Sequence, residues 1–347
     1  MQVGFVKYTR LSLIRALVIF SFYTGLHFSE VRAQDPQFSQ FYATPLYLAP
    51  SFTGATDGSR AALSYRNQWP EIPGAFVTYA FSLDHYFHNY NSGLGLLVLR
   101  DEAGSAKLAN TTVGLMYSYN FKVDHQWQMR PGVSFLYSQQ SIDYSRLIFG
   151  DQLSLDGNHS PTSLISAPSD RVGYFDASFS WLAYTNKLWI GINADHLMMP
   201  DQSLTGRGDR IPIKYSVFGG YRFQLSGSLA QTTDESISVA MLYKHQGPFN
   251  QFDFGVYWSK HPFSLGLLYR GIPIFNNPVY GVANNDAVAI LGGLRTKNLR
   301  IGYSYDFTIS RLVTSTGGAH EISLIYHFNQ GPPDKRPGKI PCPVSQQ

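Results

Sequence analysis

The chain has 347 residues, enough for one large domain or two small ones. Only 14% of them are charged, against about a quarter in an average soluble domain, whereas aromatic residues reach 15%. The formal net charge is +4, but residues 1–33 hold four basic residues and one acidic residue, so the remainder is nearly neutral (23 basic, 22 acidic) and lacks a basic surface for nucleic acid.

The first predicted element is a secretory signal peptide over residues 1–33. Basic residues precede an apolar run at 16–28, and the small residues Val31 and Ala33 suit a cleavage site. No later apolar run reaches about 18 residues, so no membrane helix is expected. The single cysteine, Cys342, cannot form an internal disulfide, so the fold does not depend on one.

Residues 34–59 come next and do not alternate cleanly. Pro36, Pro45 and Pro50 interrupt any long strand or helix. We interpret this stretch as an ordered N-terminal segment, either at the periplasmic mouth of a barrel or inside its lumen as a plug.

Strand-like runs then recur from residue 60 to residue 329. In residues 298–329, for example, apolar and aromatic side chains alternate with polar or charged ones, which puts one kind on each face of a sheet. The predicted strands are 60–68, 75–84, 93–101, 109–121, 127–140, 171–184, 187–196, 213–225, 235–245, 250–259, 262–270, 286–295, 298–308 and 319–329. We therefore predict an all-β fold, a single transmembrane antiparallel β-barrel of about fourteen strands.

The connections between these strands alternate in length. Short ones such as 122–126 and 185–186 alternate with longer ones such as 141–170, 197–212 and 271–285. Outer-membrane barrels combine tight periplasmic turns with longer external loops, and an even strand number places both termini in the periplasm.

One face of the strands supplies charges for the barrel lumen. Their mixed signs favour ion pairs that hold the wall, more than a selectivity ring. The predicted lumen-facing charges are Arg66, Asp176, Arg222, Asp253, Arg270, Arg300, Asp306 and Glu321. Residues 330–347 follow the last strand, and their prolines predict a flexible periplasmic tail.

Catalytic motifs do not appear in the sequence. It contains no GxSxG, GxxxxGK[ST] or HExxH pattern, and no arrangement of nucleophile, base and orienting group. His85 and His88 stand in a turn without further ligands, so we predict neither a metal site nor a cofactor.

The mature start, DPQFSQFYATPLYLAPSFTG at 35–54, closely resembles the opening of the PorP/SprF family of Bacteroidota, barrels of type IX secretion and gliding motility. The NQW at 67–69, the YDFTIS at 305–310 with GGAHEISLIYHF at 317–328, and the pair Cys342-Pro343 are similar to further landmarks of that family.

The resemblance implies a non-enzymatic component of the outer membrane that works with the type IX machinery. Its external loops would meet a secreted protein, in particular the C-terminal domain of an adhesin, and help to export or anchor it. The N-terminal segment and the tail would face the periplasmic ring and motor. The candidate partner-binding residues are Phe38, Phe41, Tyr42, Pro45, Leu46, Tyr47 and Cys342.

Two other classes of function stay open at this point. A fourteen-stranded barrel with an N-terminal plug is also similar in plan to transporters of hydrophobic small molecules of the fatty-acid-transporter type. An outer-membrane hydrolase would need a paired serine and histidine near the outer rim, and the sequence offers no such pair.

Overall fold

A computed structural model describes residues 35–153, 160, 163–164, 169–206, 208–226, 235–276, 283–309, 316–329 and 340–342. The chain divides into two compact units, Met1–Asp35 and Pro36–Gln347, and the second contains the barrel. Among the described residues, no helix combines the length and apolar character that a membrane span requires.

Alternating side chains form the strands of the second unit. Within its described residues the strands are β1 (Ser59–Gln68), β2 (Phe76–Phe87), β3 (Ser92–Ala103), β4 (Leu108–Tyr119), β5 (Phe121–Lys122), β6 (Gln128–Ser141), β7 (Arg171–Tyr184), β8 (Leu188–Asp195), β9 (Lys214–Ser226), β10 (Glu235–Gln246), β11 (Phe249–Lys260), β12 (Phe263–Asn276), β13 (Ala283–Arg295), β14 (Leu299–Thr308) and β15 (Ala319–Phe328). The two-residue β5 only extends the hairpin that leads into β6.

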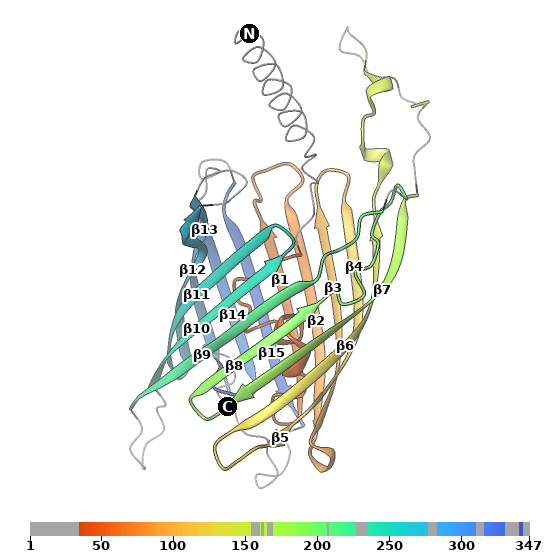
Figure 1. Cartoon of the computed structure of the whole chain (residues 1–347). Helices are drawn as coiled ribbons and strands as arrows, with labels where there is room; N and C mark the ends of the chain where they lie inside the picture. The colour runs from red at the N-terminus through yellow and green to blue at the C-terminus, as the bar shows by residue number, and fades with distance from the viewer. Residues whose placement is uncertain are drawn as a thin grey trace, which may run out of the picture. The chain divides into compact units, whose positions relative to one another are not determined.

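Every long strand pairs antiparallel with its neighbours in sequence, and the sheet closes on itself (Figure 1). Closure joins β1 to β15, from Ser59 opposite Phe328 to Gln68 opposite Ala319. The pairing of β4 with β6 completes the circle. Without β5, the described strands form a closed barrel of fourteen, which confirms the predicted fold class.

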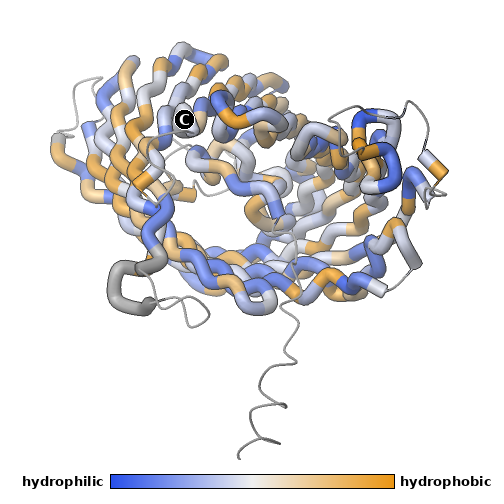
Figure 2. Tube along the Cα trace, turned by 90° about the horizontal axis from the view of Figure 1, so that it is seen from above, coloured by the Kyte–Doolittle hydropathy of each residue, from blue (hydrophilic) through white to orange (hydrophobic). Residues whose placement is uncertain are grey.

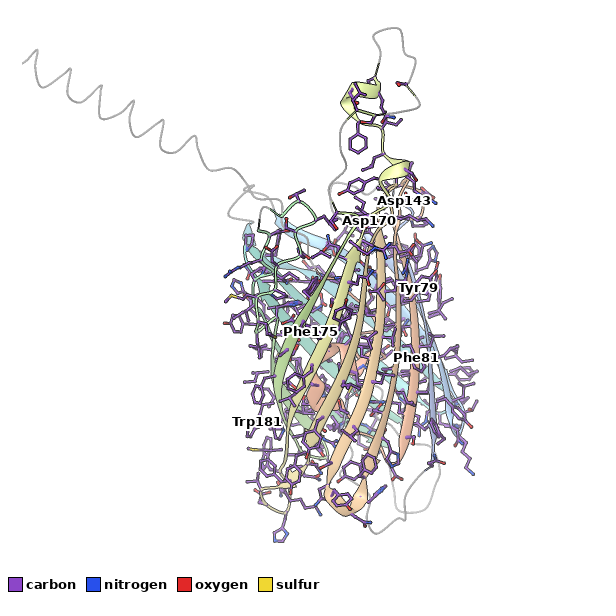
Figure 3. All side chains as sticks on the ribbon, turned by 90° about the vertical axis from the view of Figure 1, so that its right-hand side faces the viewer. Tyr79, Phe81, Asp143, Asp170, Phe175 and Trp181 are labelled. Carbon is purple, nitrogen blue, oxygen red and sulfur yellow. The ribbon has the colours of Figure 1, made fainter. Side chains whose placement is uncertain are left out.

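Side chains on the outer and inner faces differ as the alternation predicts. On β15 the outward Ile322 is 46% exposed, whereas the inward Glu321 is fully buried. The same alternation colours the whole wall in Figure 2. Aromatic residues lie on the outside at both levels, with Tyr79 towards one end of the barrel and Trp181 towards the other (Figure 3). This distribution is typical of a wall that faces lipid.

The two ends of the barrel carry different connections. We call the "turn end" the one with the tight connections 88–91, 185–187, 261–262 and 296–298, and the "loop end" the one with 142–170 and 196–213. The third long loop that the sequence predicts, 271–285, is shorter than expected, because β12 continues to Asn276 and β13 begins at Ala283. Strand bulges accommodate this extension after Arg270.

The remaining short helices lie outside the wall's ladder. Two of them, α2 (Pro45–Leu48) and the 3-10 helix η1 (Pro50–Phe52), begin at prolines, which suit the first turn of a helix, and belong to the chain that precedes β1. The others are the 3-10 helices η2 (His88–Tyr90) at the turn end, and η3 (Tyr144–Arg146) and η4 (Gly150–Gln152) at the loop end.

Candidate functional site: the filled lumen and the loop end

Residues 36–58, which we call the lumenal segment, run inside the barrel. Ser39 contacts Glu321, the third residue of β15 and therefore close to the loop end. Gly58 lies against Asn329, which follows the last strand at the turn end. The segment thus descends through the lumen from the loop-end half to the turn end, and its predicted location inside the lumen agrees with the structure.

A buried group of charges, which we call the charge cluster, holds the start of this segment. Arg66 lies 2.8 Å from Asp306 and 3.2 Å from Glu321. Arg270 lies 3.2 Å from the same Asp306 and 3.3 Å from Asp253. These five residues come from β1, β11, β12, β14 and β15 and are nearly inaccessible to solvent, so each charge depends on its partners.

Ser39 and Gln40 complete the charge cluster. The Ser39 hydroxyl donates to Asp306 at 2.6 Å and accepts from Arg66 at 3.0 Å and from Arg270 at 2.9 Å. The backbone N–H groups of Ser39 and Gln40 donate to the two Glu321 oxygens at 2.8 and 3.0 Å. Because three carboxylates face two guanidinium groups, these backbone donors supply hydrogen bonds that the arginines alone do not provide.

The Gln40 side chain extends the same contact to the neighbouring wall. Its amide oxygen accepts from Ser323 at 2.6 Å, and its amide nitrogen donates to Ser304 at 3.3 Å. Gly302 leaves room for this side chain, since a Cβ atom there would approach the Gln40 Oε1 to 2.3 Å. The wall is therefore shaped for this segment as well as charged for it.

A second polar group holds the segment near the turn end. Arg60 and Asp84 form an ion pair at 2.9 Å, and Asp84 also accepts from the Gly54 N–H at 2.6 Å. Arg130 donates to the Gly54 carbonyl at 2.8 Å, and Arg60 to the Phe52 carbonyl at 3.0 Å. The backbone of the segment is thus hydrogen-bonded to the wall at both ends of its path.

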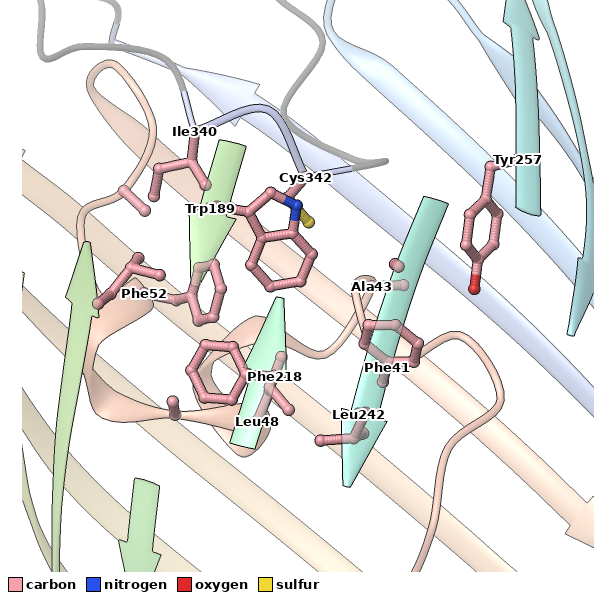
Figure 4. Packing of buried hydrophobic residues seen from close by; sticks show 14 of the residues in the cluster. Phe41, Ala43, Leu48, Phe52, Trp189, Phe218, Leu242, Tyr257, Ile340 and Cys342 are labelled. Carbon is pink, nitrogen blue, oxygen red and sulfur yellow. The ribbon is translucent and has the colours of Figure 1, made fainter. Parts of the chain in front are cut away.

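Between and below these polar contacts lies an apolar cluster (Figure 4). Phe52 packs against Trp189 and Phe218, with ring centroids 6.2 and 5.6 Å away. Ile340 and Cys342 from the C-terminal tail are buried in the same cluster. The sequence predicts a flexible tail, but its three described residues are packed, because the lumen offers them an apolar surface away from water.

The predicted partner-binding residues lie in this interior. Phe38, Phe41, Pro45, Leu46 and Cys342 are buried, and Tyr42 and Tyr47 are partly buried. Tyr42 meets Tyr257 of β11 edge to face at 5.1 Å, and the Tyr47 hydroxyl donates to the Pro36 carbonyl. The contacts of these side chains within this chain are contacts with the lumen wall and with each other.

The predicted lumen-facing charges fall into two groups. Arg66, Asp253, Arg270, Asp306 and Glu321 form the charge cluster. The other three lie elsewhere on the wall: Asp176 is buried and pairs with His196 at 2.6 Å, while Arg222 and Arg300 are partly buried.

Sequence reasoning missed the ion pair that holds Gly54 and the two polar residues at the centre of the charge cluster, Ser39 and Gln40. Arg60 and Asp84 lie on inward positions of predicted strands, so the alternation could have found them. Ser39 and Gln40 carried no periodic signal, because their segment is not a strand.

A cavity of about 250 Å³ remains beside the segment at the turn end. Small residues on neighbouring strands, among them Ser264, Gly266 and Ser323, leave this space, and Tyr42 and Arg300 also line it. Among the described residues, no group of three histidine, cysteine, aspartate or glutamate side chains is arranged to hold a metal ion.

The loops at the loop end are ordered by local hydrogen bonds. Asp201 accepts from the N–H groups of Ser203 and Asp209, both at 2.9 Å, and these bonds hold the pKa of its carboxyl below the ordinary value. Ser145 and Arg146 lower the pKa of Asp143 in the same way, through side-chain hydrogen bonds at the start of the 142–170 loop. Both loops thus keep a defined shape near their bases.

Comparison with known proteins places this barrel. A family model described as type IX secretion system membrane protein PorP/SprF matches residues 30–326. The chain belongs to this family. The PorP/SprF membership and the closed antiparallel barrel together make the protein an outer-membrane component of a type IX secretion system. No curated protein matches the chain.

Several solved barrels are similar to this PorP/SprF-family member in fold. The toluene transporter TodX of P. putida is 11% identical, with 82% of this chain and 93% of that chain covered and a TM-score of 0.43. The KdgM porin is 11% identical, with 77% and 99% covered and a TM-score of 0.35. BamA from Haemophilus ducreyi lacking POTRA domains 1–3 is 9% identical, with 78% and 70% covered and a TM-score of 0.38.

Proposed function

We propose that this barrel docks a secreted protein at its loop end and helps to export it or to hold it at the cell surface. The observation that carries the proposal is the filled lumen, which residues 36–58 cross under the hold of buried charges. A barrel whose interior is occupied by its own chain offers its rims and outer wall for binding, and loops on a rigid scaffold are the usual binding elements.

In this proposal the loop end faces the cell exterior and the turn end, with both termini, faces the periplasm, because tight turns are typical of the periplasmic side. The 142–170 and 196–213 loops would then meet the secreted protein, an adhesin-type C-terminal domain in our hypothesis. Components of the periplasmic ring and motor would meet the turn end. Since Phe38 to Tyr47 are packed on the wall, we assign the periplasmic contact to the turns around them.

The test is to replace residues 142–170 with a two-residue turn and to quantify proteins on the surface of cells that carry only this variant. We expect the secreted protein to be lost from the surface, as in cells without the barrel. A matched variant that keeps the loop's length as a Gly/Ser linker separates the loop's chemistry from its bulk. Unchanged surface proteins, with the barrel folded, would contradict the docking role.

A second candidate is the transport of a hydrophobic small molecule, which the cavity at the turn end favours. Leu265, Leu291 and Ile325 contribute apolar surface to it. Transport predicts that cells without the barrel take up such a compound more slowly while their surface proteins are unchanged. That pair of results would exchange the two candidates.

A further inference from the structure

The barrel wall has an open strand edge in its loop-end half. β7 pairs with β6 along its whole length, from Arg171 to Tyr184. On its other side it pairs with β8 only from Phe179, opposite Ala194, to Tyr184. β8 ends at Asp195, and Figure 1 shows it stopping below the rim that β7 reaches.

The backbone of β7 shows which groups face this edge. The Ala177 carbonyl accepts from the Leu197 N–H at 3.0 Å, so Ala177 directs its backbone away from β6. In an antiparallel ladder alternate residues direct their N–H and C=O to the same side, so Gly173 and Phe175 face this edge too. In the part of the chain that the structure describes, the backbone groups of Gly173 and Phe175 have no hydrogen-bond partner there.

These backbone groups are also accessible. Gly173 is exposed, and because it has no side chain its exposed surface is backbone. The outward Phe175 ring is 69% exposed and lies on the outer wall (Figure 3). The chain after β8 does not cover this edge as a strand, because His196 turns inward to pair with Asp176.

An open edge at this height needs a partner. Figure 3 shows Phe175 between the levels of Tyr79 and Phe81, on the wall that faces lipid. Lipid satisfies no backbone hydrogen bond, and an open sheet edge is not stable in the hydrocarbon region. Donors and acceptors that repeat every second residue, about 6.6 Å apart, match another extended chain.

We propose that the β7 edge from Gly173 to Ala177 accepts an extended segment of the secreted protein as an added strand of the barrel wall. The inference rests on the docking function proposed above and gives that docking a definite contact. The edge lies directly beneath the 142–170 loop, so a protein that meets this loop can reach it with one strand. Recognition is by backbone, and Phe175 supplies an apolar side chain across the new pair.

The test uses a pair of variants at one position in the full-length protein. Phe175→Pro removes the N–H that faces the edge, and proline is tolerated on a strand edge where that N–H has no partner in the barrel. Phe175→Ala removes the ring but keeps the N–H. The readouts are the amount of folded barrel, from its heat-modifiable migration in gels, and the amount of secreted protein on the cell surface.

We expect Phe175→Pro to fold and to lower the surface-held protein at least about tenfold, which corresponds to roughly 1.4 kcal/mol of binding free energy. Phe175→Ala should lower it less than Phe175→Pro does. Equal loss in both variants would make the contact one of side chains and overturn the proposal. A Phe175→Pro barrel that does not fold would also overturn it, because the N–H would then serve the barrel itself.

Two further results separate this inference from the docking function. If cells without the barrel lose the surface protein while Phe175→Pro cells keep it, docking stands and the strand edge is not its contact. If cells without the barrel keep the surface protein, both fail. Oxidation of a Gly173→Cys, Cys342→Ala variant to a disulfide-linked dimer in native membranes would make the occupant a second copy of this chain.

Discussion

The lumenal segment is held by two regions that use opposite physical chemistry. Near the loop end, Ser39 and Gln40 sit in the charge cluster, where every contact is a hydrogen bond or an ion pair. Near the turn end, Phe52 packs with Trp189 and with Ile340 of the tail. Directional bonds fix the register of the segment, whereas apolar packing tolerates small displacements, so we expect the first region to define position and the second to add stability.

The largest effect should come from the charge cluster. Arg66→Met removes one cation and leaves Asp306 and Glu321 buried beside a single arginine. Breaking a buried pair in this way costs about 3–5 kcal/mol, and we expect the free energy of unfolding to fall by that amount. Urea titration of the barrel refolded in lipid vesicles measures it. Since Arg100 lies on the exposed surface, Arg100→Met is the matched control and should change little.

A smaller effect is expected in the apolar cluster. Ile340→Ala removes a fully buried side chain from the tail, and large-to-small substitutions of this kind cost about 2–5 kcal/mol. We expect the low end of this range, because the tail enters from the turn end and its surroundings can close. Protease accessibility of the tail, with the same urea titration, measures the change. A value equal to that of Arg66→Met would remove the distinction between the two regions.

The smallest effect is expected from Ser39→Ala. The hydroxyl that links Asp306 to both arginines is lost, but the direct ion pairs and the backbone bonds to Glu321 remain. Losing one buried hydrogen-bonding group costs about 1–3 kcal/mol, and we expect the lower half of that range. If Ser39→Ala instead matches Arg66→Met, the segment is an integral part of the charge cluster and not a guest of it.

The sequence predicted the wall well, because period-two alternation is a local signal. The strand predicted at 127–140 is observed at Gln128–Ser141, and the inward positions of Arg66 and Glu321 follow from the same parity. The pairing of Arg66 with Asp306 could not be predicted, since these residues are 240 positions apart and meet only through the closure of the sheet.

The tail and the lumenal segment were harder for a related reason. Proline-rich stretches carry no period, so the burial of Ile340 and the contacts of Ser39 depend on a cavity that exists only after the wall has formed. The same holds for the early end of β8, where the sequence still alternates but the His196–Asp176 pair draws the chain inward.

The cluster that joins Phe52 to Ile340 brings together residues from before the first strand and after the last. Contacts between such distant positions form late, because the whole intervening chain must be ordered first. Ile340 can reach Trp189 only once β15 has paired with β1. The tail therefore acts as a seal on a finished barrel, and a chain stalled midway through assembly would leave this apolar end unburied and open to quality-control proteases.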